Sequence, residues 1–163
     1  MAGRCFGIFI GIDSVHLPEV RQLTEAARDA KQMYDVFRSS FDLDHTRSVL
    51  LDDANGRQAP CCAVVYDALE SIRDSDAQPD DTVIFWFSGH GFEADGRTYL
   101  AVGDTDGSNR VHQQHTSVSL DSVRAYFDQI RVRTQLIVLD ACRTGIAAAR
   151  IDSKTRRQAP ACP

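Results

Sequence analysis

Four short apolar runs, separated by segments of helical periodicity, constrain the fold of this chain more than any other feature. They cover residues 5–12, 46–51, 82–87 and 134–139. Each is rich in β-branched or aromatic residues and lacks the strict alternation of a half-exposed strand. This pattern predicts strands that are covered on both faces, as in a parallel sheet.

Three helices are predicted between these strands, at about 24–37, at 64–72 after Pro60, and from Ser119, a suitable N-cap, to about 130. Alternating strands and helices predict an α/β three-layer sandwich, with a mostly parallel sheet flanked by helices and right-handed crossovers. Between residues 91 and 118 the pattern breaks, and glycines surround a short apolar piece at 98–102. We expect a small hairpin there, followed by a long polar loop.

Length and charge narrow the class of protein. A chain of 163 residues fits one globular domain. We place its catalytic part at residues 1–145 and a basic linker or processing tail at 146–163, where the apolar periodicity ends. A net charge of -5 disfavours binding to nucleic acid or to an anionic membrane, because both need clustered cations. No apolar run approaches the ~20 residues of a membrane helix, which predicts a soluble protein.

The cysteines indicate a reducing compartment. Their number, five, is odd, and no C-x-x-C pair occurs. This argues against a disulfide framework and against a zinc ribbon. The expected location is therefore cytoplasmic.

Two reactive side chains come directly after neighbouring apolar runs. The third run leads into Ser-Gly-His-Gly, which contains His90, and the fourth leads into Asp-Ala-Cys-Arg-Thr-Gly, which contains Cys142. Adjacent strands lie about 4.8 Å apart, so the imidazole and the thiol can meet at one sheet edge. A nearby imidazole favours the nucleophilic thiolate, which predicts a Cys-His dyad. The N–H groups of Gly91 and Cys142 are candidates for an oxyanion hole.

These two motifs resemble those of the caspase and metacaspase cysteine peptidases. Cys142 lies 52 positions after His90, close to the spacing of about 50 in caspases. The resemblance spans residues 6–145 and implies the large catalytic subunit of a caspase-like fold. Asp140 stands where caspases carry glutamine, and in this respect the chain is similar to metacaspases and their bacterial relatives, the orthocaspases.

The resemblance to metacaspases implies a pocket for a basic residue. The aspartate that matches Asp140 lines that pocket in the family, and a carboxylate binds Arg bidentately or Lys as a point charge. We therefore expect a protein or peptide substrate that is cleaved after Arg or Lys. Ser88 is expected to form a minor polar wall of the pocket. Asp13 is either a second pocket carboxylate or a residue that only terminates its strand.

No cofactor or metal is expected. Many metacaspases have a calcium-dependent, Asp-rich segment after the Gly-His-Gly, but here only Asp95, Asp104 and Asp106 lie nearby, so calcium is possible but not favoured. His112 and His115 have no evident third partner for a metal.

The family resemblance also implies missing parts. Its members complete their sheet with a small subunit after the cysteine, whereas the sequence ends 21 residues after Cys142. The small-subunit strands are therefore absent, and the chain is a processed or truncated large subunit or pairs with a separate small subunit. The tail is either a solvated basic segment or a site of self-processing, and its candidate cleavage points are Arg150, Lys154, Arg156 and Arg157.

Two functions from different classes fit this sequence. The first is a cysteine endopeptidase in a regulated proteolytic pathway, with bacterial defence as one setting and an activating protein as a further partner. The second is an inactive caspase-like module that binds or regulates other proteins. The intact His90 and Cys142 motifs favour the first, and the missing small subunit favours the second.

Overall fold

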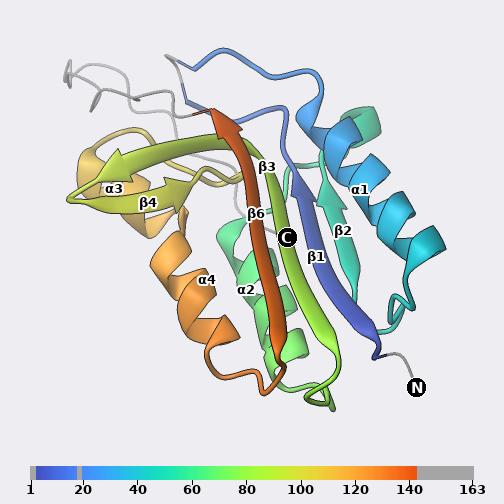
Figure 1. Cartoon of the computed structure of the whole chain (residues 1–163). Helices are drawn as coiled ribbons and strands as arrows, with labels where there is room; N and C mark the ends of the chain where they lie inside the picture. Colours follow the sequence, from blue (N-terminus) through green and yellow to red (C-terminus); the bar gives the residue numbers. More distant parts are fainter. Residues whose placement is uncertain (1–2, 18–19, 143–163) are drawn as a thin grey trace.

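A parallel sheet of four strands forms the centre of the molecule (Figure 1). The computed structural model describes residues 3–17 and 20–142, and it describes Cys142 by its backbone. The strands run side by side in the order β2, β1, β3, β6, and all three pairings are parallel. They are β1 (Cys5–Gly11), β2 (Val49–Asp52), β3 (Thr82–Ala94) and β6 (Thr134–Cys142). All four predicted strands are therefore confirmed, with shifted ends.

Helices cover both faces of this sheet, as the apolar periodicity predicts. Helix α1 (Ala26–Ser40) lies on one face, and α2 (Cys62–Arg73) and α4 (Leu120–Phe127) lie on the other (Figure 1). Each helix buries residues at helical spacing, such as Val65, Leu69 and Ile72 of α2. The predicted three-layer α/β sandwich is thus confirmed.

Strand β3 is longer than the apolar run that predicts it. We expected a strand end at residue 87, but β3 continues to Ala94 and its second half pairs antiparallel with β4 (Arg97–Leu100). The continuation is possible because β4 takes over the edge of β3 that β1 leaves free after Gly11. A two-residue turn joins the strands at Asp95 and Gly96, with φ of 52° and 73°, the left-handed geometry of a tight hairpin.

The segment predicted as a long polar loop contains further regular structure. A short helix, α3 (Arg110–His115), precedes β5 (Val118–Ser119), which pairs with β4. The side chain of Asn109 accepts a hydrogen bond from the N–H of His112 at 2.9 Å and so caps α3. The short 3-10 helix η1 (Ala54–Gly56) also lay outside the prediction. Neither helix is long enough to show apolar periodicity.

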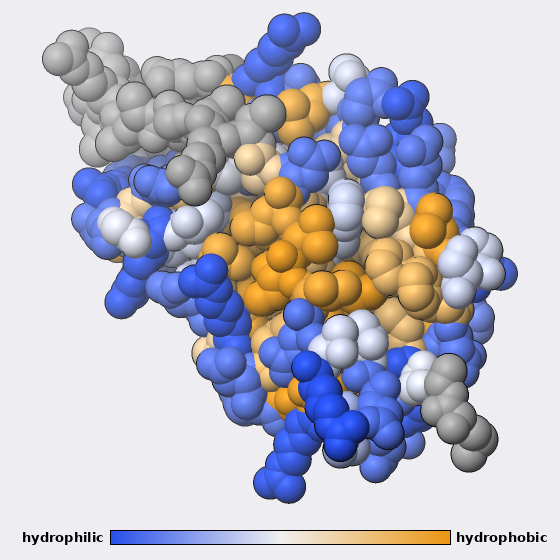
Figure 2. Space-filling view, viewed as in Figure 1, coloured by the Kyte–Doolittle hydropathy of each residue, from blue (hydrophilic) through white to orange (hydrophobic). Residues whose placement is uncertain are grey.

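Strand β6 departs from the prediction that every strand is covered on both faces. Leu136 is 43% exposed and Leu139 is 37% exposed, although β1 is buried along its whole length. The reason is position, because β6 forms the edge of the described sheet and α1 packs on β1, β2 and β3. Figure 2 shows apolar surface gathered in the middle of this side of the molecule.

The amino edge of the sheet is held by a buried carboxylate. Asp81 accepts hydrogen bonds from the N–H of Arg4 at 2.7 Å, from the N–H of Gln78 at 2.7 Å and from the Arg4 guanidinium at 3.2 Å. Burial raises the pKa of Asp81, but these hydrogen bonds outweigh it and the pKa lies below its usual range.

We expect Asp81→Ala to lower the free energy of unfolding by about 1–3 kcal/mol at pH 7, because two part-buried backbone N–H groups lose their acceptor. A carboxylate with a lowered pKa stabilises the fold above its unfolded pKa, and that stabilisation is lost as the pH falls through the folded pKa. The difference between wild type and variant should therefore shrink below about pH 4. Urea unfolding between pH 3 and pH 7 measures this, and an equal difference at every pH would contradict it.

Candidate active site

The carboxyl edge of the parallel sheet brings the predicted site residues together. In the pairing of β3 with β6, Ser88 lies opposite Asp140 and His90 lies opposite Cys142. Parallel neighbours in a sheet lie about 4.8 Å apart. The Ser88–Asp140 pair and the His90–Cys142 pair are two residues apart along the strands. Both lie within the strands and not in the loops that follow them. Two segments separated by about 50 residues in the sequence therefore meet at one edge.

His90 is almost completely buried, and one of its ring nitrogens has a backbone partner. The side chain is 3% exposed, and Nε2 lies 2.8 Å from the carbonyl oxygen of Arg21. A carbonyl can only accept, so Nε2 must carry the proton. In the neutral ring this leaves a lone pair on Nδ1, which is buried and has no hydrogen-bond partner in the part of the chain that the structure describes. The ring is thus fixed in the tautomer in which Nδ1 can act as a base.

The Arg21 carbonyl is the functional group that the sequence does not reveal. No third side chain to orient His90 is evident in the sequence. In the structure a main-chain oxygen takes that place. Every residue has a carbonyl group, so no residue type marks this position. Only the path of the loop between β1 and α1 shows which carbonyl reaches the histidine.

The backbone around His90 is fixed on the β4 side. The carbonyl of His90 accepts a hydrogen bond from the N–H of Ala101 at 2.9 Å. Backbone groups alternate along a strand, so the N–H of Gly91 faces the opposite edge, where β6 ends at Cys142. Gly89 is needed for packing, because a Cβ there would lie 2.9 Å from the ring of Phe87.

Ser88 and Asp140 lie opposite each other at this edge, and Asp13 follows β1 at the same edge. Asp140 is exposed and makes no hydrogen bond or ion pair with any residue that the structure describes, whereas Ser88 is buried. The Asp13 carboxylate already has a partner. Its Oδ1 accepts a hydrogen bond from the N–H of Ala26 at 2.8 Å, at the start of α1. Asp140 is thus the exposed carboxylate beside the His90 and Cys142 positions.

The other described cysteines are poor nucleophiles. Burial raises the pKa of Cys5 to about 11, and burial together with the charge of Asp104 raises that of Cys62 to about 12. Cys61 is disulfide-bonded and so is not a free thiol. Neither free thiol has the depressed pKa that a reactive cysteine needs.

The aspartates that follow the Gly-His-Gly are each engaged with a separate group. Asp95 pairs with Arg110 at 2.7 Å, and Asp104 accepts from the N–H of Cys62 at 2.9 Å. Asp106 accepts from Ser108 and pairs with His112. Within residues 3–17 and 20–142, no group of three or more His, Cys, Asp or Glu side chains is arranged to hold a metal ion.

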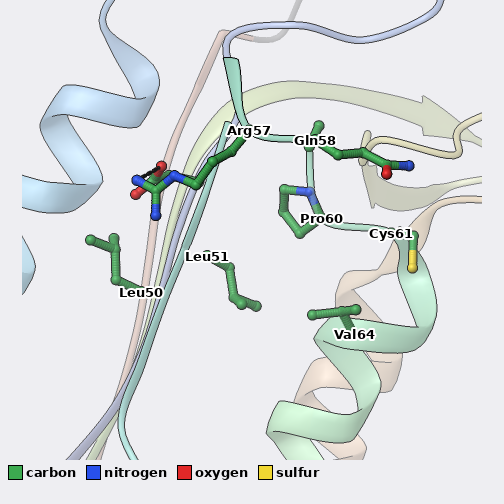
Figure 3. Close-up of a pocket in the computed structure, with 9 residues that line it drawn as sticks. Leu50, Leu51, Arg57, Gln58, Pro60, Cys61 and Val64 are labelled. Atoms are coloured by element: carbon green, nitrogen blue, oxygen red, sulfur yellow. Dashed lines mark ion pairs between the residues drawn. The ribbon is translucent and has the colours of Figure 1, made fainter. Parts of the chain in front are cut away.

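A shallow apolar pocket lies elsewhere, between β2 and the start of α2 (Figure 3). It is formed largely by Leu50, Leu51, Pro60 and Val64, and the Arg57 guanidinium lies 2.5 Å from Asp52 at its rim. The second oxygen of Asp52 is buried and unpaired, so a ligand could not reach it. This pocket contains none of the predicted site residues.

Three predictions lie beyond the described residues or concern the whole chain. The candidate cleavage points Arg150, Lys154, Arg156 and Arg157 belong to the tail at 146–163, which is outside the described residues. The division of the chain at residue 145 stays a prediction for the same reason. Among the described helices, none is long and apolar enough to cross a membrane.

The chain combines a parallel α/β sheet with a histidine and a cysteine opposite each other at its carboxyl edge. This is the arrangement expected of an α/β cysteine peptidase. The family model of the caspase domain matches residues 4–161. The chain therefore belongs to the caspase-domain family of cysteine peptidases, as the two motifs predicted. A search among curated proteins found no match.

Proposed function

We propose that this protein is a cysteine endopeptidase that cleaves after Arg or Lys, with Cys142 as nucleophile and His90 as base. One observation carries the proposal. The strand register places Cys142 opposite His90, whose Nε2 is held by the Arg21 carbonyl and whose Nδ1 has no partner among the described residues. This leaves one ring nitrogen for proton transfer.

The reaction would proceed through an acyl-enzyme. Nδ1 of His90 accepts the proton of the Cys142 thiol, and the thiolate attacks the carbonyl carbon of the scissile bond. The N–H groups of Gly91 and Cys142 stabilise the negative oxygen of the tetrahedral intermediate. The imidazolium then gives its proton to the leaving amine, and a thioester forms. Water, deprotonated by the same ring, hydrolyses the thioester and releases the second product.

Asp140 supports the preference for a basic residue. Its carboxylate is exposed and has no partner within residues 3–17 and 20–142, while its strand neighbour Ser88 is buried. An unpaired carboxylate at the mouth of the site can form a charge-assisted pair with an Arg or Lys side chain of the substrate. Asp13 supports the pocket less well, because its Oδ1 already accepts from Ala26.

The outer edge of β6 supports a role for a small subunit that completes the sheet. Within the described residues that edge has no neighbouring strand, and Leu136 beside it is exposed. Unpaired edges with apolar residues invite another strand. Self-processing after Arg150, Lys154, Arg156 or Arg157, and activation by another protein in a proteolytic or defence pathway, are further parts of this proposal. They rest on the basic tail and on the family.

A panel of fluorogenic peptides that differ only in the residue before the cut tests this function. We expect turnover after Arg and Lys and at least about 100-fold less after Asp or Ala, because the basic residue alone can pair with Asp140. The assay uses the full chain with and without calcium, alone and with a co-expressed small subunit. Turnover only after Asp would overturn the pocket assignment, and no turnover in any condition would favour the inactive module.

A further inference from the structure

Two aspartates, Asp13 and Asp53, form a hydrogen-bonded network around the loop that contains Arg21. Strands β1 and β2 are parallel neighbours, and Gly11 lies opposite Asp52. The residues that follow, Asp13 and Asp53, therefore meet at the same edge of the sheet. Both Asp53 oxygens accept from the N–H of Asp13, at 3.0 and 3.1 Å, and Oδ2 also accepts from the N–H of Ser14 at 2.7 Å.

Asp13 extends this network to the other end of the loop. Its carbonyl accepts from the N–H of Leu23 at 2.8 Å, and its Oδ1 accepts from the N–H of Ala26 at 2.8 Å. Leu23 is two residues from Arg21, whose carbonyl contacts His90. Hydrogen bonds thus link Asp53 to Asp13 and Asp13 to Leu23, and the main chain from Leu23 back to Arg21 completes the path to the histidine.

Among the described residues of the loop, two other hydrogen bonds lie near Arg21. The N–H of Val20 bonds to the carbonyl of Leu17 at 3.1 Å, and the side chain of Gln22 bonds to the carbonyl of Val15 at 3.2 Å. Val15 and Leu17 are buried in the core. The start of the loop is thus anchored by Asp53 and by apolar packing, and the part after Arg21 is anchored by Asp13.

We propose that Asp53 and Asp13 are positioning residues that hold the Arg21 carbonyl against His90. This inference rests on the proposed function, in which His90 is the base. It also gives Asp13 a role other than that of a pocket carboxylate. A pocket carboxylate acts on the binding of Arg substrates, whereas a positioning residue acts on the chemical step.

The test compares Asp53→Ala with Asp53→Asn. The Asn side chain keeps an oxygen that accepts from the loop N–H groups, and Ala does not. We expect Asp53→Ala to lower kcat about 100-fold with KM changed less than about 3-fold, because an imidazole displaced by about 1 Å loses this much. Asp53→Asn should restore most of the loss. Asp13→Ala keeps the carbonyl bonded to Leu23 but loses the acceptor for the N–H of Ala26, so it should lower kcat in the same direction by less, and it replaces Asp53→Ala if that variant fails to fold.

Asp44→Ala is the matched control. Asp44 also accepts two hydrogen bonds within its own loop, from the N–H and hydroxyl of Thr46, but it lies at the amino end of β1. The Asp44→Ala variant should be less stable than wild type but keep the wild-type kcat. A folded Asp53→Ala with wild-type kcat, an equal loss in Asp44→Ala, or no rescue by Asn would each overturn the inference.

A second measurement does not depend on peptidase activity. Long-range ¹H–¹⁵N spectra of histidine-labelled protein at pH 8 report the tautomer of His90. The His90 signal is the one that is absent from the spectrum of His90→Gln. We expect the Nε2–H tautomer in wild type and in Asp44→Ala, and a mixture in Asp53→Ala. If no peptide is cleaved but this pattern appears, the proposed function fails and the positioning role stands. An unchanged Nε2–H signal in Asp53→Ala would overturn the positioning role whatever the activity.

Discussion

Replacing Cys142 by alanine is expected to reduce kcat for Arg peptides by at least about 10⁴-fold, because no other group can form the acyl-enzyme. Loss of the base in His90→Ala should cost about 10²- to 10⁴-fold. The double variant should be no slower than Cys142→Ala, since the two side chains act in one step and their effects do not add. Single-turnover kinetics with a fluorogenic Arg peptide measure all three.

Cys62→Ala is the matched control for this prediction. Its thiol is free, and burial and Asp104 raise its pKa to about 12, so it should neither react nor contribute to turnover. An iodoacetamide titration should therefore label wild type and Cys62→Ala equally and Cys142→Ala much more slowly. Turnover that survives in a folded Cys142→Ala protein would show that the nucleophile lies elsewhere.

Removing the charge of Asp140 should produce the second large effect. Asp140→Asn keeps the size of the side chain but loses the negative charge. We expect kcat/KM for Arg peptides to fall about 100-fold, because losing one partner of a desolvated charge pair costs about 3 kcal/mol. Peptides with a neutral residue before the cut should change by less than about 3-fold, since they never form that pair.

Asp128→Asn provides the control for charge alone. Asp128 is also exposed, but it ends α4 on the way to the amino end of β6, away from His90. Its replacement should leave kcat/KM unchanged. The alkylation rate of Cys142 in Asp140→Asn separates binding from chemistry, because a pocket residue should alter it little. If Asp140→Asn cleaves Arg peptides as well as wild type, another group must bind the basic side chain.

The sequence predicts the parts of this fold that depend on apolar periodicity. The four apolar runs and the three helical stripes are present as strands and long helices, although β6 is largely exposed. The continuation of β3 to Ala94 could not be predicted in this way. Its residues after Phe87 are held by pairing with β6 as far as His90 and with β4 from Gly91 onward, and not by an apolar run. The exposure of β6 depends on which strand lies at the edge, which no local pattern shows.

The site residues also differ in whether the sequence alone predicts them. His90 and Cys142 stand out in the sequence because reactive side chains between small residues at strand ends have few structural roles. Arg21 contributes through its carbonyl, and Asp53 through hydrogen bonds to backbone N–H groups. Neither interaction needs a distinctive motif. Both follow from the way in which neighbouring strand ends bring loops together, which becomes visible only in three dimensions.

Strand β3 is paired on both edges at His90, and this limits how the enzyme can change between a dormant and an active state. At His90 one edge is bonded to Ala101 and the other lies against β6. The N–H of Ala101, which is bonded to His90, should therefore exchange with deuterium only when the sheet itself opens, at a free energy near that of global unfolding. The histidine is thus a static element of the machinery. Any transition between dormant and active states must act on the edge strand that carries the cysteine, or on the loop that carries Arg21.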